Sequence, residues 1–228
     1  MLRLEDLRLE QGTFRLAADL EVGPGISAVI GPSGAGKSTL LAAIGGFAPP
    51  ASGRILWNGQ DIGPRAPGDR PVSTVFQDHN LFPHLDVVRN VGLGVSPRLN
   101  LDAADRDRIA AVLDRVGLAG MDTRLPAALS GGQQSRVALA RVLVRETPVV
   151  LLDEPFAALG PALRAEMLDL VAETLAGRTV LMVTHDPRDA RRAAPTAIVV
   201  ADGRAEPPTP TAALLDDPPP ALRAYLGG

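Results

Sequence analysis

The stretch GPSGAGKST, residues 31–39, decides the fold of this chain. It matches the pattern G-x-x-x-x-G-K-[ST], whose glycines let the backbone curl so that several N–H groups point at phosphate oxygens. Residues 26–30 form an apolar run typical of a buried parallel strand, and residues 38–44 predict a helix that stops at Gly45 and Gly46. Because a strand and a helix flank the loop, we interpret it as a phosphate-binding loop rather than as an ordinary glycine-rich turn.

The loop predicts ATP and Mg²⁺ as ligands. The ammonium group of Lys37 would reach the β- and γ-phosphates, and the hydroxyl of Ser38 would bind Mg²⁺. Lys37 is the only lysine among 23 basic residues, the others being arginines, which indicates a need for a compact ammonium in place of a planar guanidinium. The predicted ATP-binding residues of the loop are Gly31, Pro32, Ser33, Gly34, Ala35, Gly36, Lys37, Ser38 and Thr39.

The composition excludes several classes of protein. A chain of 228 residues fits one large α/β domain. The absence of cysteine excludes disulfides, thiolate metal sites and cysteine nucleophiles, and the net charge of −3 gives no basic excess for binding nucleic acid. No apolar run approaches the ~20 residues that span a bilayer, and the charged N-terminus does not resemble a signal peptide. We therefore expect a soluble chain that reaches a membrane only through a partner.

Strand and helix patterns alternate on both sides of a helical block. Short apolar runs predict buried strands at residues 72–76, 149–152 and 180–183. Helical spacing is found at residues 103–116, 131–144 and 161–175. This order predicts a parallel α/β core with an inserted helical subdomain. The Pro-rich residues 207–220 predict a surface tail without long regular elements.

Two carboxylates follow the strand predicted at residues 149–152. The phosphate-loop fold needs an acid at a strand end to position Mg²⁺ through water, and Asp153 fits that place. Glu154 beside it can polarise the attacking water. Such a pair is more often a solvated strand end, but in a chain with a phosphate loop we assign it to the site.

The segment LSGGQ, residues 129–133, places a serine and two glycines immediately before a predicted helix. Ser130 is the predicted N-cap of that helix, and the segment is also a second anion-binding arrangement.

Two single polar residues stand at predicted strand ends. Gln77 follows the strand at residues 72–76, and His185 follows the strand at residues 180–183. Ligands bind at this edge of a parallel sheet, so we predict functional roles for both residues. His79 and His84 have no such position, and we interpret them as structural or interfacial.

Taken in order, the phosphate loop, Gln77, LSGGQ, LLDE at residues 151–154 and His185 closely resemble the ATP-binding subunits of ABC transporters. The resemblance covers nearly the whole chain. It implies an ABC ATPase core with a mainly parallel sheet, an N-terminal antiparallel β portion and an inserted α-helical subdomain. Residues 1–79 and 146–228 would form the core and residues 80–145 the subdomain, without a C-terminal regulatory domain.

The resemblance also implies roles for individual residues. Glu154 would be the catalytic base, His185 would contact the γ-phosphate, and Lys37 would complete the catalytic set. The implied Mg²⁺ ligands are Ser38, Gln77 and Asp153, the last through water. Two copies would pair head to tail, each site being completed from the other copy by Ser130, Gly131, Gly132 and Gln133.

Partners and location follow from the same resemblance. The chain would form a homodimer on integral membrane permease subunits at the cytoplasmic face of the inner membrane. A periplasmic solute-binding protein would act indirectly, and no nucleic acid would be involved. An apolar patch for the membrane partner is predicted at Leu81, Phe82, Pro83 and Leu85.

A finer resemblance concerns residues 70–100, 143–146, 161–164 and 199–204, which look like those of the ATP-binding subunits of bacterial thiamine importers. It implies thiamine as the transported solute. The turn at residues 23–25 is similar to one in molybdate importers, so another small solute such as molybdate is the alternative. An ABC ATPase acting on nucleic acid or ribosomes is disfavoured by the single cassette, and a small-molecule kinase is disfavoured by LSGGQ.

Two positions depart from the family pattern. Gln11 stands where an aromatic residue commonly stacks on adenine, and Phe14 is the nearest replacement. Gly160 stands where the family usually has an aspartate through which one copy senses the other's site. We therefore expect hydrolysis to survive with altered coupling between the two sites.

Overall fold

The computed structural model describes residues 1–220 and 222–223 of the chain. These residues divide into two compact units. The first comprises Met1–Thr74, Pro148–Glu154 and the described residues from Ala176 onward, and the second comprises Val75–Thr147 and Pro155–Leu175.

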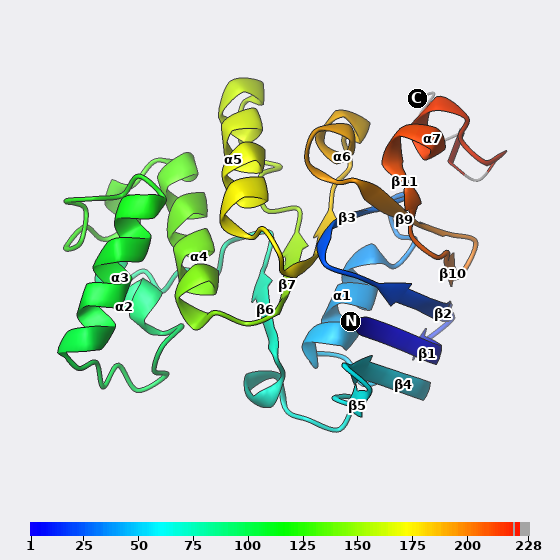
Figure 1. Ribbon diagram of the computed structural model, residues 1–228, viewed down its shortest axis with the longest axis horizontal. Helices are drawn as coiled ribbons and strands as arrows, with labels where there is room; N and C mark the ends of the chain where they lie inside the picture. The colour runs from blue at the N-terminus through cyan, green and yellow to red at the C-terminus, as the bar shows by residue number, and fades with distance from the viewer. Residues whose placement is uncertain (221, 224–228) are drawn as a thin grey trace. The chain divides into compact units, whose positions relative to one another are not determined.

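The centre of the first unit is a group of parallel strands. Strand β3 (Gly25–Ile30) pairs in parallel with β8 (Thr179–Val183) on one side and with β9 (Thr196–Ala201) on the other, and β8 pairs in parallel with β7 (Val149–Asp153) (Figure 1). Every residue of β8 is buried. Both faces of such strands are covered, which explains their continuous apolar runs.

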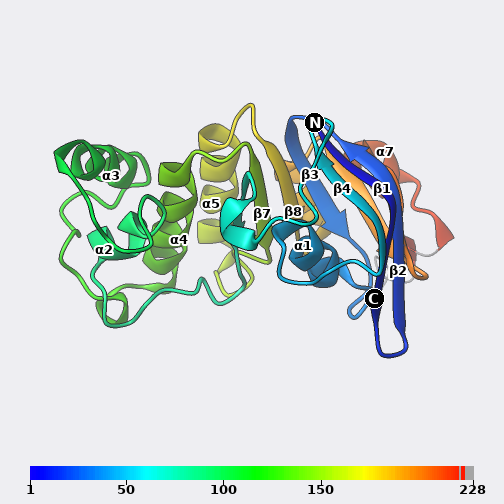
Figure 2. The ribbon, with the colours of Figure 1, turned by 90° about the horizontal axis from the view of Figure 1, so that it is seen from below.

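An antiparallel portion extends the same sheet from the N-terminus. Strand β1 (Leu2–Gln11) pairs with β2 (Phe14–Val22) and with β4 (Ser52–Trp57), and Figure 2 shows the three side by side. Strand β10 (Arg204–Ala205) joins the two portions, because it pairs in parallel with β2 and antiparallel with β9. The remaining short strands are β5 (Gln60–Asp61), β6 (Val72–Val75) and β11 (Thr209–Pro210). The predicted α/β fold class is confirmed.

A bulge in β1 explains why its apolar residues alternate imperfectly. The register shifts between Leu4 and Leu7 against β2 and between Glu5 and Arg8 against β4, and Asp6, inside both intervals, has a positive φ of 45°. The extra residue returns Leu7 and Leu9 to the face that already buries Leu2 and Leu4. All four leucines therefore enter one core.

Helix α1 (Lys37–Gly45) lies against this sheet and begins directly at the end of the phosphate loop (Figure 2). Its C-terminal end is held by Arg70, which is 4% exposed and donates hydrogen bonds to the carbonyl oxygens of Ala43 and Ile44 at 2.8 and 2.9 Å. The same guanidinium donates to the carbonyl oxygens of Arg65 and Gly63. Burial lowers the pKa of Arg70.

The Pro-rich residues 207–220 are mostly exposed and have no long regular elements, as predicted, but they do contain two short ones. These are β11, paired with β9, and the short helix α7 (Thr211–Asp216). Thr211 is buried and donates to the carbonyl oxygen of Ala194 at 2.6 Å. Proline excludes long elements here, but it does not prevent a two-residue strand beside β9 and a six-residue helix. Helix α6 (Pro187–Ala193) and the 3₁₀ turn Pro67–Asp69 complete the first unit.

The second unit is helical. Helix α4 (Gly131–Arg145) packs against α2 (Val87–Gly92), α3 (Ala103–Arg115) and α5 (Pro161–Thr174) (Figure 1). A 3₁₀ turn, Pro126–Ala128, precedes α4. The helices predicted at residues 103–116, 131–144 and 161–175 are confirmed to within one residue at each end. Among the described residues, no helix is long and apolar enough to cross a membrane.

Candidate active site

The phosphate loop needs glycine at two positions for steric reasons. Gly31 has a φ of 150°, and a Cβ atom there would lie 2.0 Å from the carbonyl oxygen of Val200. Gly36, the N-cap of α1, has a φ of 101°, and its Cβ would lie 2.3 Å from Cζ of Phe14. Any side chain at either position would therefore force the loop away from β9 or Phe14. The aromatic ring supports the loop from one side.

Lys37, the first residue of α1, is held against the carbonyl groups at the start of the phosphate loop. Its side chain is 5% exposed, and Nζ donates hydrogen bonds of 2.8 Å to the carbonyl oxygens of Gly31 and Pro32. Burial lowers the pKa of Lys37, although the nearby charges of Glu154 and Asp153 act in the opposite direction. The loop thus presents one well-positioned ammonium group at the start of a helix, where the dipole also favours an anion.

Ser38 and Asp153 meet across the sheet edge. The hydroxyl of Ser38 donates a 3.0 Å hydrogen bond to Oδ1 of Asp153, which is the last residue of β7. Burial raises the pKa of Asp153, the negative charge of Glu154 adds to this, and the bond from Ser38 opposes it. These two side chains place a hydroxyl and a carboxylate oxygen beside the loop.

Glu154 follows directly in a left-handed conformation with φ of 47°. A left-handed non-glycine residue costs about 1–3 kcal/mol and persists only where its surroundings hold it. Its carboxylate is mostly buried and contacts Nε2 of His185. The turn that contains His185 is ordered by Thr184, whose Oγ1 donates to Asp189 at 3.0 Å and accepts from the backbone N–H of Asp186 at 3.1 Å.

The strand register explains why these residues converge. Val183 is the partner of Asp153 in β7 and of Val29 in β3, so the three strands end at one edge. A pocket of about 300 Å³ opens there. Its lining residues are Gln11, Phe14, Ser33, Gly34, Gly36, Lys37, Ser38, Thr39, Glu154 and His185.

The LSGGQ segment lies in the second unit and forms a capping box. Oγ of Ser130 accepts from the N–H of Gln133 at 3.3 Å, and Oε1 of Gln133 accepts from the N–H of Ser130 at 3.0 Å. The predicted N-cap role of Ser130 is confirmed. Gly132 is buried, and a Cβ there would lie 2.5 Å from the side chain of Leu163 in α5. Gln77 is exposed in the same unit, and the binding roles of these residues stay predictions.

Sequence reasoning missed the residues that support the site. Thr184 and Asp189 order the turn on which His185 lies, yet neither was predicted. The signal was a threonine directly before the histidine, which can form a local hydrogen-bonded turn. His79, interpreted from sequence as structural or interfacial, hydrogen-bonds to Ser135 at 2.8 Å. Burial lowers the pKa of His79.

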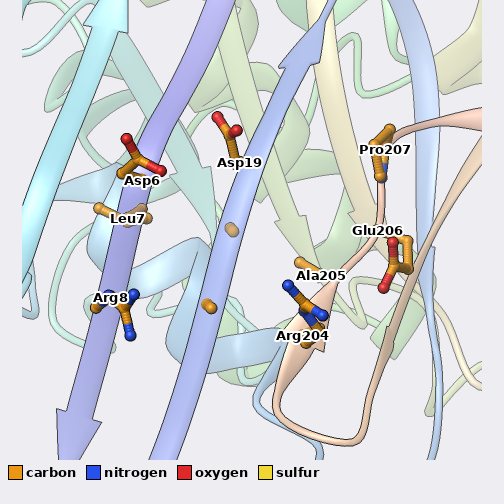
Figure 3. A pocket seen from close by; sticks show the side chains of 10 residues that line it. Asp6, Leu7, Arg8, Asp19, Arg204, Ala205, Glu206 and Pro207 are labelled. Atoms are coloured by element: carbon orange, nitrogen blue, oxygen red, sulfur yellow. The ribbon is translucent and has the colours of Figure 1, made fainter.

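A separate pocket of about 280 Å³ lies over β1, β2 and β10 (Figure 3). Two arginines, Arg8 and Arg204, line this pocket together with three acids, Asp6, Asp19 and Glu206. Mixed charges on an open strand surface favour no single class of ligand, and no residue of the phosphate loop lines it. Residues of the phosphate loop line the pocket beside Lys37 instead.

The ABC transporter family model matches residues 17–157, a stretch that contains the phosphate loop, LSGGQ and both carboxylates. The chain belongs to the ABC transporter family. This ABC ATPase is 65% identical to the thiamine import ATP-binding protein ThiQ of Cereibacter sphaeroides, with 100% of both chains covered. It is 59% identical to ThiQ of Ruegeria sp. strain TM1040, again over 100% of both. The ABC ATPase is thus an ATP hydrolase coupled to transport.

Solved structures show the same fold. The dimeric bacterial ABC transporter cassette MJ0796 is 28% identical, with a TM-score of 0.78 over 92% of this chain and 99% of that one. CbiO1 of Clostridium perfringens, part of the CbiONQ transporter complex, is 29% identical, with a TM-score of 0.82 over 95% of this chain and 90% of that one. A further MJ0796 structure holds ADP and phosphate in a post-hydrolysis state. Nucleotide binding by this ABC ATPase agrees with these likenesses.

Proposed function

We propose that this ABC ATPase drives the import of thiamine. The support is the identity of 65% and 59% to two thiamine import ATP-binding proteins over their full lengths. The solute itself would be bound by other subunits, so the residues of this chain do not select it. The alternative is the same role for another small solute such as molybdate.

The single observation that carries the catalytic proposal is the convergence of Lys37, Ser38, Glu154 and His185 in one pocket. We infer that residues 31–39 bind the phosphates of ATP through backbone N–H groups and that Lys37 neutralises the β- and γ-phosphates. The two bonds of Lys37 to loop carbonyls keep its ammonium within the loop.

The residues beside the loop fit Mg²⁺. Ser38 and Asp153 offer hard oxygen ligands 3.0 Å apart, the ligand type that Mg²⁺ prefers. In the part of the chain that the structure describes, no cluster of three or more His, Cys, Asp or Glu side chains could hold a metal alone. This suits Mg²⁺, which takes one or two protein ligands and completes its shell with phosphate and water. Ser38 and Asp153 would hold the ion, with Gln77 as a further predicted ligand, and it would neutralise charge on the phosphates.

Glu154 and His185 supply the chemistry of hydrolysis. The carboxylate of Glu154 would accept a proton from the attacking water, as a general base must. His185, in contact with that carboxylate, would keep it oriented and would itself contact the γ-phosphate. Phe14 and Gln11 line the same pocket and are the side chains available to the adenine ring.

The site would be completed by a second copy of the chain. Two copies would pair head to tail, with Ser130, Gly131, Gly132 and Gln133 of one copy closing on the ATP bound by the other. Dimeric MJ0796 is a structural precedent for such pairing. Permease subunits would bind at the patch of residues 81–85, in which Phe82 is 46% exposed. A periplasmic solute-binding protein would deliver the solute, and the ATPase would act at the cytoplasmic face of the inner membrane.

Reconstitution tests the proposal. The ATPase would be assembled with its copurifying permease and solute-binding protein in lipid vesicles, and phosphate release measured with thiamine or molybdate outside. We expect several-fold stimulation by thiamine, none by molybdate, and no hydrolysis with Lys37→Met as the control. Stimulation by molybdate alone would transfer the assignment to that solute, and copurification with RNA instead of a permease would contradict an importer.

A further inference from the structure

The loop that follows Gln77 is bound to two other segments of the second unit through one imidazole. Nε2 of His79 lies 2.8 Å from Oγ of Ser135 and 3.2 Å from the carbonyl oxygen of Pro155. Ser135 is buried in the second turn of α4, the helix that LSGGQ begins. Pro155 is the residue directly after Glu154. One ring nitrogen therefore joins three segments that carry predicted catalytic or binding residues.

The donors and acceptors around that nitrogen are consistent with a single arrangement. The carbonyl oxygen of Pro155 can only accept, so Nε2 must carry the proton. The hydroxyl of Ser135 donates its own proton to the carbonyl oxygen of Gly131 at 3.1 Å, which leaves Oγ as an acceptor for His79. The Nε2–H group is thus shared between Pro155 and Ser135, and the tautomer follows from the network.

A second anchor lies next to the first. Arg141, two turns further along α4 from Ser135, donates to the carbonyl oxygen of Asn80 at 2.9 Å and to the carbonyl oxygen and Oδ1 of Asn90 at 3.0 Å each. Burial lowers the pKa of Arg141. The loop is consequently tied to α4 at two adjacent residues, His79 and Asn80.

The backbone at these points has an unfavourable conformation that needs such anchors. His79 and Asn80 have consecutive positive φ values of 58° and 46°, and Glu154, directly before Pro155, has a φ of 47°. Left-handed residues persist where the surrounding contacts over-determine them. The bond from His79 to Pro155 fixes one end of the peptide segment whose other end is Glu154.

We propose that His79 is a positioning residue for ATP hydrolysis, which couples the Gln77 loop and the LSGGQ helix to the segment that carries Glu154. This role rests on the ATPase activity of the chain. Without the His79 bond, Glu154 would hold its left-handed geometry less often, and the catalytic step would slow. ATP binding at residues 31–39 would be unaffected, because none of those residues takes part in the bridge.

The test compares three variants of the full chain with wild type by steady-state ATPase kinetics and by nucleotide binding. His79→Phe removes the donor, His79→Gln restores an N–H group at similar reach, and Ser135→Ala removes only one acceptor. Asn100→Ala is the control, since Asn100 is an exposed residue of the same unit to which no catalytic or binding role is given. Loss of one to two neutral hydrogen bonds should lower kcat about tenfold in His79→Phe, with KM and the affinity for ATP unchanged.

Each outcome supports or overturns the role. Recovery of kcat to within about twofold of wild type in His79→Gln, with an intermediate kcat in Ser135→Ala, supports positioning through the bond. Equal loss in His79→Phe and His79→Gln, or a wild-type kcat in His79→Phe, overturns it. If His79→Phe does not fold, an unchanged kcat in Ser135→Ala overturns it instead. Absence of hydrolysis in the wild-type chain would contradict the ATPase function, a result distinguishable from failure of the bridge.

Discussion

Exchange of Lys37 for arginine tests how closely the phosphate loop is fitted to an ammonium group. The Lys37 side chain is 5% exposed and makes two hydrogen bonds of 2.8 Å to loop carbonyls. A guanidinium is longer and planar, and extra volume in a packed site costs about 1–3 kcal/mol. Misplacing a charged hydrogen bond costs about 1.5–3 kcal/mol more. Even a combined loss near the lower end of these two ranges, about 3 kcal/mol, predicts ATP binding weakened about 150-fold in Lys37→Arg.

The assay is isothermal titration of the purified chain with a non-hydrolysable ATP analogue and Mg²⁺. Arg98→Lys is the matched control, because it makes the reverse exchange at an exposed position and should leave the affinity unchanged. Thermal unfolding of Lys37→Arg should show that the fold is retained. An affinity within about threefold of wild type, a difference below about 0.7 kcal/mol, would refute the reasoning that this site requires a compact ammonium.

Three further predictions concern single positions. Gly160 is the N-cap of α5; its backbone is extended, it makes no side-chain hydrogen bond, and the space at its Cβ is open. Gly160→Asp should therefore raise the melting temperature by about 1–2 °C, through a few tenths of a kcal/mol, and should increase the cooperativity of ATP hydrolysis. An unchanged melting temperature and unchanged cooperativity would contradict this. Arg70→Leu leaves four carbonyl oxygens without their buried donor, so it should lower the unfolding free energy, measured by chemical denaturation, by about 3–5 kcal/mol. The control Arg98→Leu, at an exposed position, should lower it by less than about 0.5 kcal/mol. Folding raises the pKa of Asp153, so the folded state binds more protons than the unfolded state. The unfolding free energy of wild type should therefore increase relative to that of Asp153→Asn as the pH falls through the raised pKa towards 3.8. A difference in unfolding free energy that stays constant across this pH range would show that the carboxyl is not perturbed.

The sequence predicted the parts of the molecule that depend on local pattern. Residues 31–39, the strand ends before Asp153 and His185, and the cap at Ser130 all follow from spacing and residue type, because a phosphate loop needs glycine and lysine at fixed places. The bulge at Asp6 could only be suspected from imperfect alternation.

Other features depend on long-range packing and leave no local signal. Nothing in the sequence distinguishes Arg70 from the other arginines, yet it is buried against the end of α1. The bond between His79 and Ser135 joins residues far apart in sequence. The contact of Phe14 with Gly36 depends on the register of β2 against the loop. Such contacts follow from the three-dimensional arrangement alone.

The proposed mechanism is tested most directly by measuring phosphate release and the oligomeric state of Glu154→Gln in the presence of ATP and Mg²⁺. This variant should bind ATP as tightly as wild type, pair into a dimer, and hydrolyse ATP at least about 100-fold more slowly, the usual contribution of a general base. Hydrolysis at the wild-type rate would contradict the role of Glu154. Hydrolysis at the full rate by a wild-type chain that remains monomeric would contradict a site completed by Ser130 of a second copy.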